Sequence, residues 1–219
     1  MGAPTGARRR RARPMDPAER RARLLRCAVR VFARRGLQGA SYAEIAREAR
    51  VAVPTVFVYF PTRAELVRAV LDEVARFTLD AARRIHDSRR PAPETILEHG
   101  RAFIDVMNEH PEYIRVLLEW GSSIREESWP LYLGLQEQLV EIIAATIRRW
   151  RIESGRDLDK RAEDDARLIV ATGPMLSQMK FARVPEEKIE QFLQSLIRDT
   201  LGVMPGSAGE RIEAAGSQP

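Results

Sequence analysis

The residue types that usually carry catalysis or metal binding are few and scattered in this 219-residue sequence. Its three histidines, His86, His99 and His110, fit neither an HExxH motif nor any paired metal-binding spacing. A single cysteine, Cys27, excludes an intramolecular disulfide framework and suits a reducing cytoplasm. Neither a GxSxG nucleophile motif nor a phosphate-binding glycine loop occurs. The sequence therefore predicts no enzyme, no metal and no cofactor.

Arginine is the residue type whose number and placement do indicate a partner. Residues 1–90 hold 21 Lys and Arg against 9 Asp and Glu, whereas residues 91–219 hold 15 against 22. A basic half joined to an acidic half indicates that one end of the molecule faces a polyanion such as nucleic acid. No stretch is apolar and long enough to span a bilayer, so no membrane partner is predicted.

The elements that must position these charges are helices. Period-3.6 apolar spacing is common, alternating β-branched runs are absent, and Pro and Gly fall mainly between segments. We predict an all-α fold of about nine helices. Its regions are a basic flexible arm over 1–15, a three-helix unit over 16–62, a larger helical body over 63–204 and a disordered polar tail over 205–219.

The three-helix unit carries clear start signals. Asp16 followed by Pro17 is a typical helix beginning, and Ser41 with Glu44 forms a capping box that opens a second helix. A short third helix follows, and Thr62 caps a fourth that ends near residue 86. Two short helices joined by a tight turn, inside a basic segment, predict a helix-turn-helix.

The third helix of this motif, over 53–60, would enter the major groove of double-stranded DNA. We expect Val56, Phe57 and Phe60 to hold it against the first and fourth helices. The side chains then left to face DNA are Val53, Thr55, Val58 and Tyr59.

The same residues resemble a known family. The patterns LLxxAxxVFxxxG over 24–36, SxxEIA over 41–46 and TxFxYF over 55–60 are similar to the DNA-binding domain of the TetR family of transcriptional regulators. The runs VFARRG over 31–36, TVFxYFPTR over 55–63 and EWxxSxRxExWPL over 119–131 further resemble the quorum-sensing master regulators of vibrios, the HapR/SmcR group.

The resemblance implies how the domain over 16–62 would contact DNA. Phosphate contacts would come from Ser41, Tyr42, Thr55, Tyr59 and Arg63, and base contacts from Val53 and Val58. The basic arm would reach the minor groove through Arg8, Arg9, Arg10, Arg11 and Arg13. Ordinary packing of the two tyrosines and a merely solvated arm are the alternatives. Val58 stands where the vibrio group has asparagine, so the operator sequence cannot be transferred.

The resemblance also implies that the body over 63–204 binds a ligand and dimerises. A mostly apolar small molecule would be held by Phe77, His99, Phe103, Met107, Leu117, Trp120, Gln136, Leu139, Ile143, Met175, Gln178 and Met179. Ordinary core packing is the alternative for each of them. Homodimer contacts would come from helices over about 160–182 and 186–201, through Ile169, Leu176, Phe192, Leu193 and Leu196.

Together these features predict a TetR-type repressor, or an activator, that binds a pseudo-palindromic operator as a dimer and responds to a ligand. Ligand binding would tilt the fourth helix and so change the spacing of the two DNA-reading helices. The vibrio likeness would add a role in quorum sensing. The alternative from another class is a ligand-independent architectural DNA-binding protein, which would discriminate little between sequences.

Overall fold

The computed structural model describes residues 16–124, 127–156 and 161–203. The predicted arginine arm, with Arg8, Arg9, Arg10, Arg11 and Arg13, and the predicted tail over 205–219 lie outside these residues. The described residues form ten α-helices and no strand, which confirms the all-α prediction. The helices are α1 (Pro17–Gly39), α2 (Tyr42–Ala49), α3 (Val53–Tyr59), α4 (Arg63–His86), α5 (Ala92–Glu109), α6 (Pro111–Ser122), α7 (Trp129–Glu153), α8 (Ala162–Ala171), α9 (Gly173–Phe181) and α10 (Glu186–Leu201).

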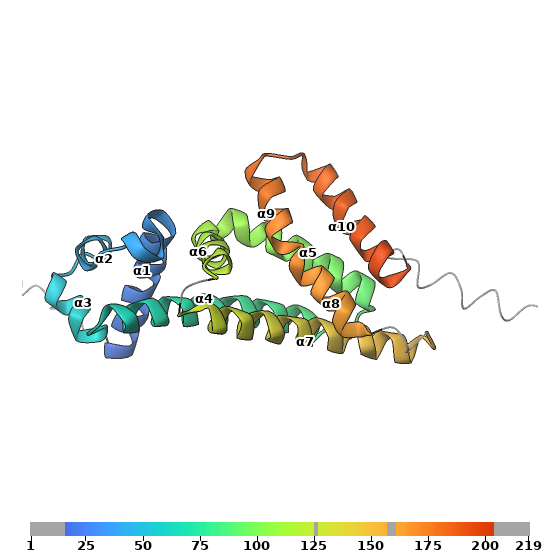
Figure 1. The fold of residues 1–219 in the computed structure, drawn as a ribbon, viewed down its shortest axis with the longest axis horizontal. Coiled ribbons are helices and arrows are strands. Elements are labelled where there is room, and N and C mark those ends of the chain that lie inside the picture. The colour runs from blue at the N-terminus through green and yellow to red at the C-terminus, as the bar shows by residue number, and fades with distance from the viewer. Residues whose placement is uncertain (1–15, 125–126, 157–160, 204–219) are drawn as a thin grey trace, which may run out of the picture.

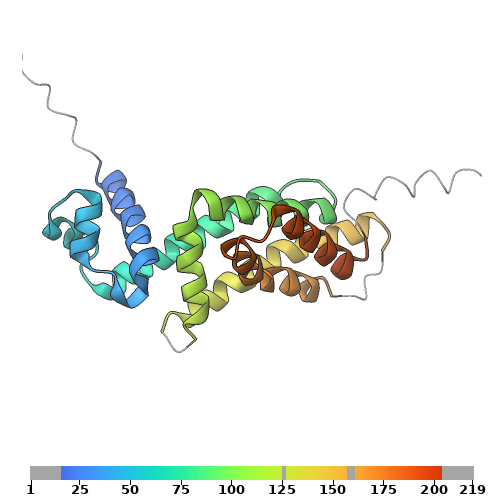
Figure 2. The same cartoon turned by 90° about the horizontal axis from the view of Figure 1, so that it is seen from above.

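The molecule is elongated, with α1, α2 and α3 gathered at one end (Figure 1). Helix α4 leaves this end and runs into the body alongside α7, while α6 crosses between the two parts (Figures 1 and 2). Helices α5, α8, α9 and α10 complete the body at the other end. In the described residues, no helix is long and apolar enough to cross a membrane.

Local signals set most helix boundaries. The Ser41 hydroxyl oxygen accepts a hydrogen bond from the Glu44 N–H, and the Thr62 hydroxyl oxygen accepts one from the Glu65 N–H. Both predicted N-caps are therefore confirmed. Helix α1 begins at Pro17 as predicted, although the Asp16 side chain makes no capping hydrogen bond. The predicted end of α4 near residue 86 is also correct.

The prediction of one helix over about 160–182 is wrong, because α8 and α9 are separate helices. The break lies at Thr172, whose N–H bonds to the Ile169 carbonyl. Pro174 follows two residues later, and proline lacks an N–H and disfavours helical backbone in the residue before it. The break turns the chain within the wall of the body.

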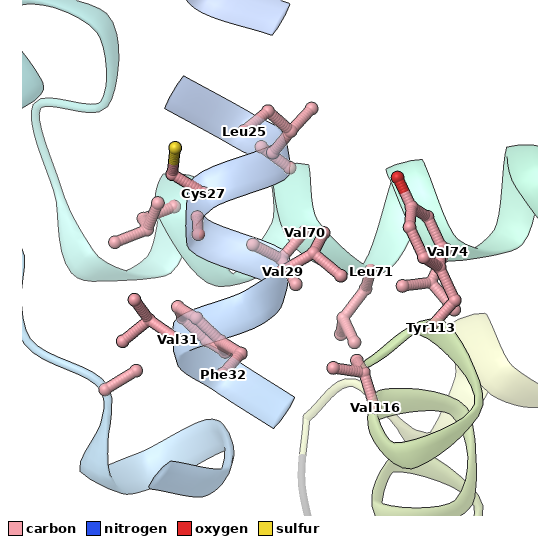
Figure 3. Close-up of a cluster of buried hydrophobic side chains, with 14 of the residues drawn as sticks. Leu25, Cys27, Val29, Val31, Phe32, Val70, Leu71, Val74, Tyr113 and Val116 are labelled. Atoms are coloured by element: carbon pink, nitrogen blue, oxygen red, sulfur yellow. The ribbon is translucent and has the colours of Figure 1, made fainter. Parts of the chain in front are cut away.

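Two clusters of buried apolar side chains hold the helices together. The first joins α1, α2, α3 and α4 to α6 and the start of α7, and the second joins α5, α8, α9 and α10 to the rest of α7. Figure 3 shows side chains of three helices in the first cluster: Val29 and Phe32 of α1, Val70 and Leu71 of α4, and Val116 of α6. The predicted domain boundary at residue 62 therefore does not separate two cores, since Leu66 and Val70 of α4 belong to the first cluster.

Candidate DNA-binding surface and ligand cavity

The α2–α3 turn has the compact geometry of a helix-turn-helix. Helix α2 ends at Ala49, and the C-cap residue that follows, Arg50, has a left-handed backbone with φ of 55°. Its N–H and that of Val51 close the helix on carbonyls of the last turn. Only two residues then separate Arg50 from α3, so the second helix of the pair is placed at a fixed angle to the first.

Helix α3 buries one edge and exposes the rest. Val56 and the following Phe60 are fully buried in the first cluster. Val58 is 76% exposed, and Val53 is also exposed, as expected for residues that face DNA. The expectation that Phe57 packs inward is wrong, because its side chain is 46% exposed.

Phe57 is held from one side by Tyr42. The two rings are stacked with centroids 4.1 Å apart and planes 5° from parallel. The Tyr42 hydroxyl donates a hydrogen bond of 2.8 Å to the Phe60 carbonyl, and partial burial raises the pKa of this tyrosine. Tyr42 thus ties the start of α2 to the end of α3. It also supports an exposed aromatic ring on the outer surface of α3.

Arg63, at the start of α4, is turned into the domain. Its guanidinium donates hydrogen bonds to the carbonyl oxygens of Leu37 and Ala40 and lies 5.1 Å over the ring of Phe32. These contacts join the beginning of α4 to the end of α1. Two of the N–H donors of Arg63 are therefore used within the domain, and its predicted phosphate contact stays a prediction for the remaining donors.

The arginines of α1 and α2 fall into two groups. Glu48 pairs with Arg30 and Arg34, and Glu44 pairs with Arg35. The bonds to these guanidinium groups hold the pKa of each glutamate below its usual range. Arg47 and Arg50, which lie beside α3, are exposed and make no ion pair within the described part of the chain.

Helix α1 is joined to α6 by a hydrogen bond across the two parts of the molecule. The Leu37 N–H donates to Glu119 Oε1 at 2.7 Å. Gly36 permits this approach, because its backbone has φ of 80° and ψ of 168°, and a Cβ there would lie 2.8 Å from the same oxygen.

A cavity of about 170 Å³ lies between the two apolar clusters. Its wall is drawn from α4 to α10 and is mostly aliphatic and aromatic. The side chains of Phe77, Leu117 and Leu139 come from the first cluster or pack against it, and those of Ile96 and Leu193 come from the second. A molecule in this cavity would therefore contact both clusters at once.

Two histidines form a polar relay at the cavity. His99 lines the wall, and its Nδ1 lies 3.1 Å from His86 Nε2. His86 is buried, and its Nδ1 lies 2.9 Å from the Thr146 hydroxyl on α7. Burial lowers the pKa of His99 to about 4. Burial, with the nearby His99 and Arg149, lowers the pKa of His86 to about 3, so both rings are neutral near pH 7.

Comparison with known proteins agrees with the helix-turn-helix geometry. Residues 24–70 match the model of the bacterial regulatory proteins, tetR family. This stretch, which runs from within α1 to within α4, is therefore similar to that family. The HTH-type transcriptional regulator LuxR of Vibrio harveyi is 39% identical over 119 residues, which are 54% of this chain and 58% of that protein. This match confirms the predicted vibrio resemblance.

Two further relatives extend the comparison. The HTH-type transcriptional repressor SCO4008 of Streptomyces coelicolor is 30% identical over 130 residues, or 59% of this chain and 64% of that protein. The alignments therefore span about three fifths of the curated relatives. A cysteine mutant of the TetR family regulator CifR, solved with 26-bp operator DNA, has a TM-score of 0.68 at 21% identity, over 86% of this chain and 98% of that one. That likeness shows that the fold continues beyond the TetR-family domain.

The structure sorts the predicted ligand residues into two sets. The residues that line the cavity are Phe77, His99, Phe103, Leu117, Gln136 and Leu139. Trp120, Ile143 and Met107 are buried elsewhere in the core, and Met179 is half-buried against the second cluster. Met175 and Gln178 are exposed on the outer side of α9, so their prediction as cavity residues is wrong.

Most of the predicted dimer residues point inward. Ile169, Leu176 and Leu193 are at most 7% exposed and line the cavity, so they cannot meet a second chain without unfolding the body. Leu196 is half-buried and also lines the cavity, and Phe192 is half-buried against the second cluster.

Several functional candidates were missed by the sequence reasoning. Phe57 was assigned to packing, and the signal for its exposure is weak because α3 has only seven residues. Tyr132 lines the cavity next to Gln136 and was not predicted there. Exposed apolar side chains on α8 and α9 were also missed; they are Leu168, Met175 and Phe181.

Proposed function

We propose that the chain is a sequence-specific transcriptional regulator that reads double-stranded operator DNA with α3. The main support is the exposed, largely apolar surface of α3. The helix-turn-helix that presents this surface is held in place by the hydrogen bonds of Tyr42 and Arg63. A surface helix of a monomer normally exposes polar residues, and a bare apolar ridge of this kind indicates a partner. The likeness to LuxR and SCO4008, both described as HTH-type regulators, supports the proposal.

The exposed residues of α3 suggest how bases would be read. Val53, Phe57 and Val58 offer no hydrogen-bonding groups, so they suit the methyl group of thymine in the major groove. Phosphates would be contacted at the rim of this surface by Ser41, Thr55 and Tyr59, together with backbone N–H groups at the helix ends. Arg63 would act indirectly, by holding α4 against α1. The unpaired arginines beside α3 would make binding depend steeply on salt.

We propose that two chains associate through α8 and α9. Leu168, Met175 and Phe181 are each about half exposed there. Apolar side chains gathered on adjacent helices are typical of an interface between identical subunits. A two-fold axis would then place two copies of α3 one DNA turn apart, about 34–36 Å, or at a larger spacing, on a pseudo-palindromic site.

We propose that a small molecule in the cavity regulates DNA binding. The cavity borders α4 and α6, and both helices also belong to the cluster that carries α1. A shift of α4 would be passed to the end of α1 through the Arg63 contacts, and a shift of α6 would be passed to the same segment through Glu119. The likeness to a Vibrio regulator supports a role of this kind in quorum sensing, and the absence of a membrane-spanning helix from the described residues is compatible with a cytoplasmic site of action.

In-vitro selection from a random DNA pool, at fixed salt, tests the DNA-reading proposal. We expect a pseudo-palindrome that contains thymines at defined positions. A Val58→Asn variant should select a different base at one position of each half-site, whereas Leu133→Asn, at an exposed leucine of α7, should leave the selected site unchanged. Recovery of A·T-rich DNA without a defined site would favour the architectural alternative instead.

Sedimentation of matched variants tests the association surface. Leu168→Glu should convert dimers to monomers, because two like charges would be buried across the two-fold axis. Leu133→Glu places the same charge at a comparably exposed leucine outside the proposed surface and should stay dimeric. Equal effects of the two substitutions would refute the assignment.

A further inference from the structure

The exposed side of α3 is a continuous strip of side chains that have no hydrogen-bonding group. This strip, called here the α3 strip, consists of Val53, Pro54, Phe57 and Val58. The members are four residues apart in pairs, so they lie one above the other on the same side of the helix. Thr55 and Tyr59, the polar residues of α3, are half-buried, and the helical period places them outside the strip. A group that the α3 strip recognises must therefore be apolar.

The charges around the α3 strip indicate what kind of surface it meets. Arg47 and Arg50 are exposed beside α3 and make no ion pair in the described part of the chain. Residues 49–64 contain no Asp or Glu. An apolar strip with unpaired guanidinium groups next to it is complementary to the major groove of DNA, because the base edges there lie between two rows of phosphates.

The major groove offers one apolar group to such a strip, which is the C5-methyl group of thymine. Cytosine carries hydrogen at the same ring position. The two bases also differ at position 4, where thymine has an acceptor oxygen and cytosine has an amino donor. Side chains without donors or acceptors can detect the methyl group but make no hydrogen bond at position 4. A cytosine that is methylated at C5 would therefore be recognised like thymine.

Phe57 is the member of the α3 strip whose position is fixed by another helix. One face of its ring is stacked on Tyr42, with centroids 4.1 Å apart and planes 5° from parallel. The Tyr42 hydroxyl donates a hydrogen bond of 2.8 Å to the Phe60 carbonyl, which holds the supporting ring in place. The Phe57 side chain nevertheless stays 46% exposed. A ring that is already ordered loses little conformational freedom on binding, so Phe57 is well suited to detect a single methyl group.

We propose that α3 recognises operator DNA by the C5-methyl groups of its pyrimidines. Phe57 is the residue that determines this specificity, and Tyr42 is its positioning residue. Methylation of cytosine at C5 then strengthens binding, and removal of the methyl group from thymine weakens it. The inference deepens the proposed DNA-reading function and rests on it, because it names the chemical group that is read.

Three parallel selections with the full chain distinguish the two levels of the proposal. One random pool contains the natural bases, the second has uracil in place of thymine, and the third has 5-methylcytosine in place of cytosine. We expect defined thymines from the first pool, no preference for uracil at those positions in the second, and thymine or 5-methylcytosine alike in the third. The same preference for uracil as for thymine would overturn this inference alone. No defined site from any pool would overturn the DNA-reading proposal as well.

Dissociation constants for single substitutions in the selected site measure the contribution of each methyl group. Replacing a defined thymine by uracil should weaken binding about four-fold, the effect expected for burying one methyl-sized group. At the same position, 5-methylcytosine should bind about four-fold more tightly than cytosine. Equal affinities for cytosine and 5-methylcytosine would refute recognition of the methyl group.

Variants test the roles of Phe57 and Tyr42 through the ratio of uracil to thymine dissociation constants, which a general loss of affinity does not change. Phe57→Ala should bring this ratio close to one at one position of each half-site. Leu133→Ala, at a side chain of α7 that is also 46% exposed, should leave the ratio at about four. Tyr42→Leu should lower the ratio, whereas Tyr42→Phe keeps the stacked ring and should retain most of it. An unchanged ratio in Phe57→Ala would overturn the assignment of Phe57.

Discussion

The two ends of the molecule use polar side chains in opposite ways. At the end that carries α1, α2 and α3, Tyr42, Arg63 and Glu119 each bond to backbone groups of another element, and the interior between them is filled with apolar side chains. At the other end, His86 and His99 bond to each other beside an empty space. The first arrangement fixes a surface, whereas the second leaves room for a molecule to change the packing. A regulator of this design needs both, joined by helices that belong to each end.

The largest expected effect comes from adding a side chain at Gly36, where the end of α1 contacts Glu119 of α6. Gly36→Ala would force a side chain into a backbone conformation that is almost restricted to glycine and against Glu119, so we expect about 3 kcal/mol less stability. Urea denaturation measures this loss. Gly39→Ala, three residues later, meets only the Arg35 Cβ at 3.6 Å and should cost less than about 1 kcal/mol. Equal losses of stability in Gly36→Ala and Gly39→Ala would show that α1 and α6 are not tightly packed at Gly36.

The next effect concerns the fixed surface at Arg63. Arg63→Ala removes two charged hydrogen bonds to backbone carbonyls, and we expect about 2 kcal/mol of lost stability together with weaker binding to every DNA sequence. Arg68→Ala, at an exposed arginine one turn further along α4, should change stability by less than about 0.5 kcal/mol. If Arg63→Ala weakens DNA binding but leaves stability unchanged, Arg63 contacts a phosphate, as the sequence first predicted.

Acid should act on the cavity end first. His86 and His99 have pKa values of about 3 and about 4 when folded, below the ordinary 6.5, so only the unfolded chain takes up their protons as pH falls below 6.5. The free energy of unfolding should therefore fall from pH 6.5 toward pH 4, by up to about 1.4 kcal/mol per pH unit for each histidine. His99→Gln should reduce this slope.

The smallest effect separates stability from DNA contact at Arg50. Arg50 and Arg183 both have left-handed backbones, with φ of 55° and 58°. Glycine at either position should raise stability by about 1 kcal/mol, because the left-handed conformation is strained for a side chain. Only Arg50→Gly should also weaken DNA binding, by two- to five-fold, and lower its salt dependence, since Arg50 lies beside α3. If both variants bind DNA like the wild type, Arg50 contacts no phosphate.

The boundaries of α1 to α4 could be predicted because their causes are local. A capping hydroxyl at Ser41 or Thr62 and a proline at position 17 act on neighbouring residues. The direction in which an apolar residue faces has no local cause, because it depends on which other helices pack against its own. Core, cavity and subunit interface all require apolar side chains at helical spacing, so Leu176 and Met175 could not be distinguished from sequence.

Two further contacts could not be predicted because they join residues that lie on different helices. The bond from Leu37 to Glu119 joins residues 82 positions apart, and no pattern within either segment predicts it. The pairing of His86 with His99 requires α4 and α5 to be packed in one register. Phe57 was misplaced for a different reason, because a helix of two turns gives too few residues to define its inner face.

The first apolar cluster has a consequence for how the chain unfolds. Because α1, α4 and α6 share it, a fragment cut at residue 62 would expose one side of α1 and lose the partners of Phe32 and Val29. Such a fragment should not fold alone, and the whole chain should melt in one cooperative transition. Trp120 lies in the first cluster and Trp150 in the second, so their fluorescence should change at the same temperature. A molecule bound in the cavity would then protect the DNA-reading end from heat and proteolysis even though it touches none of its residues.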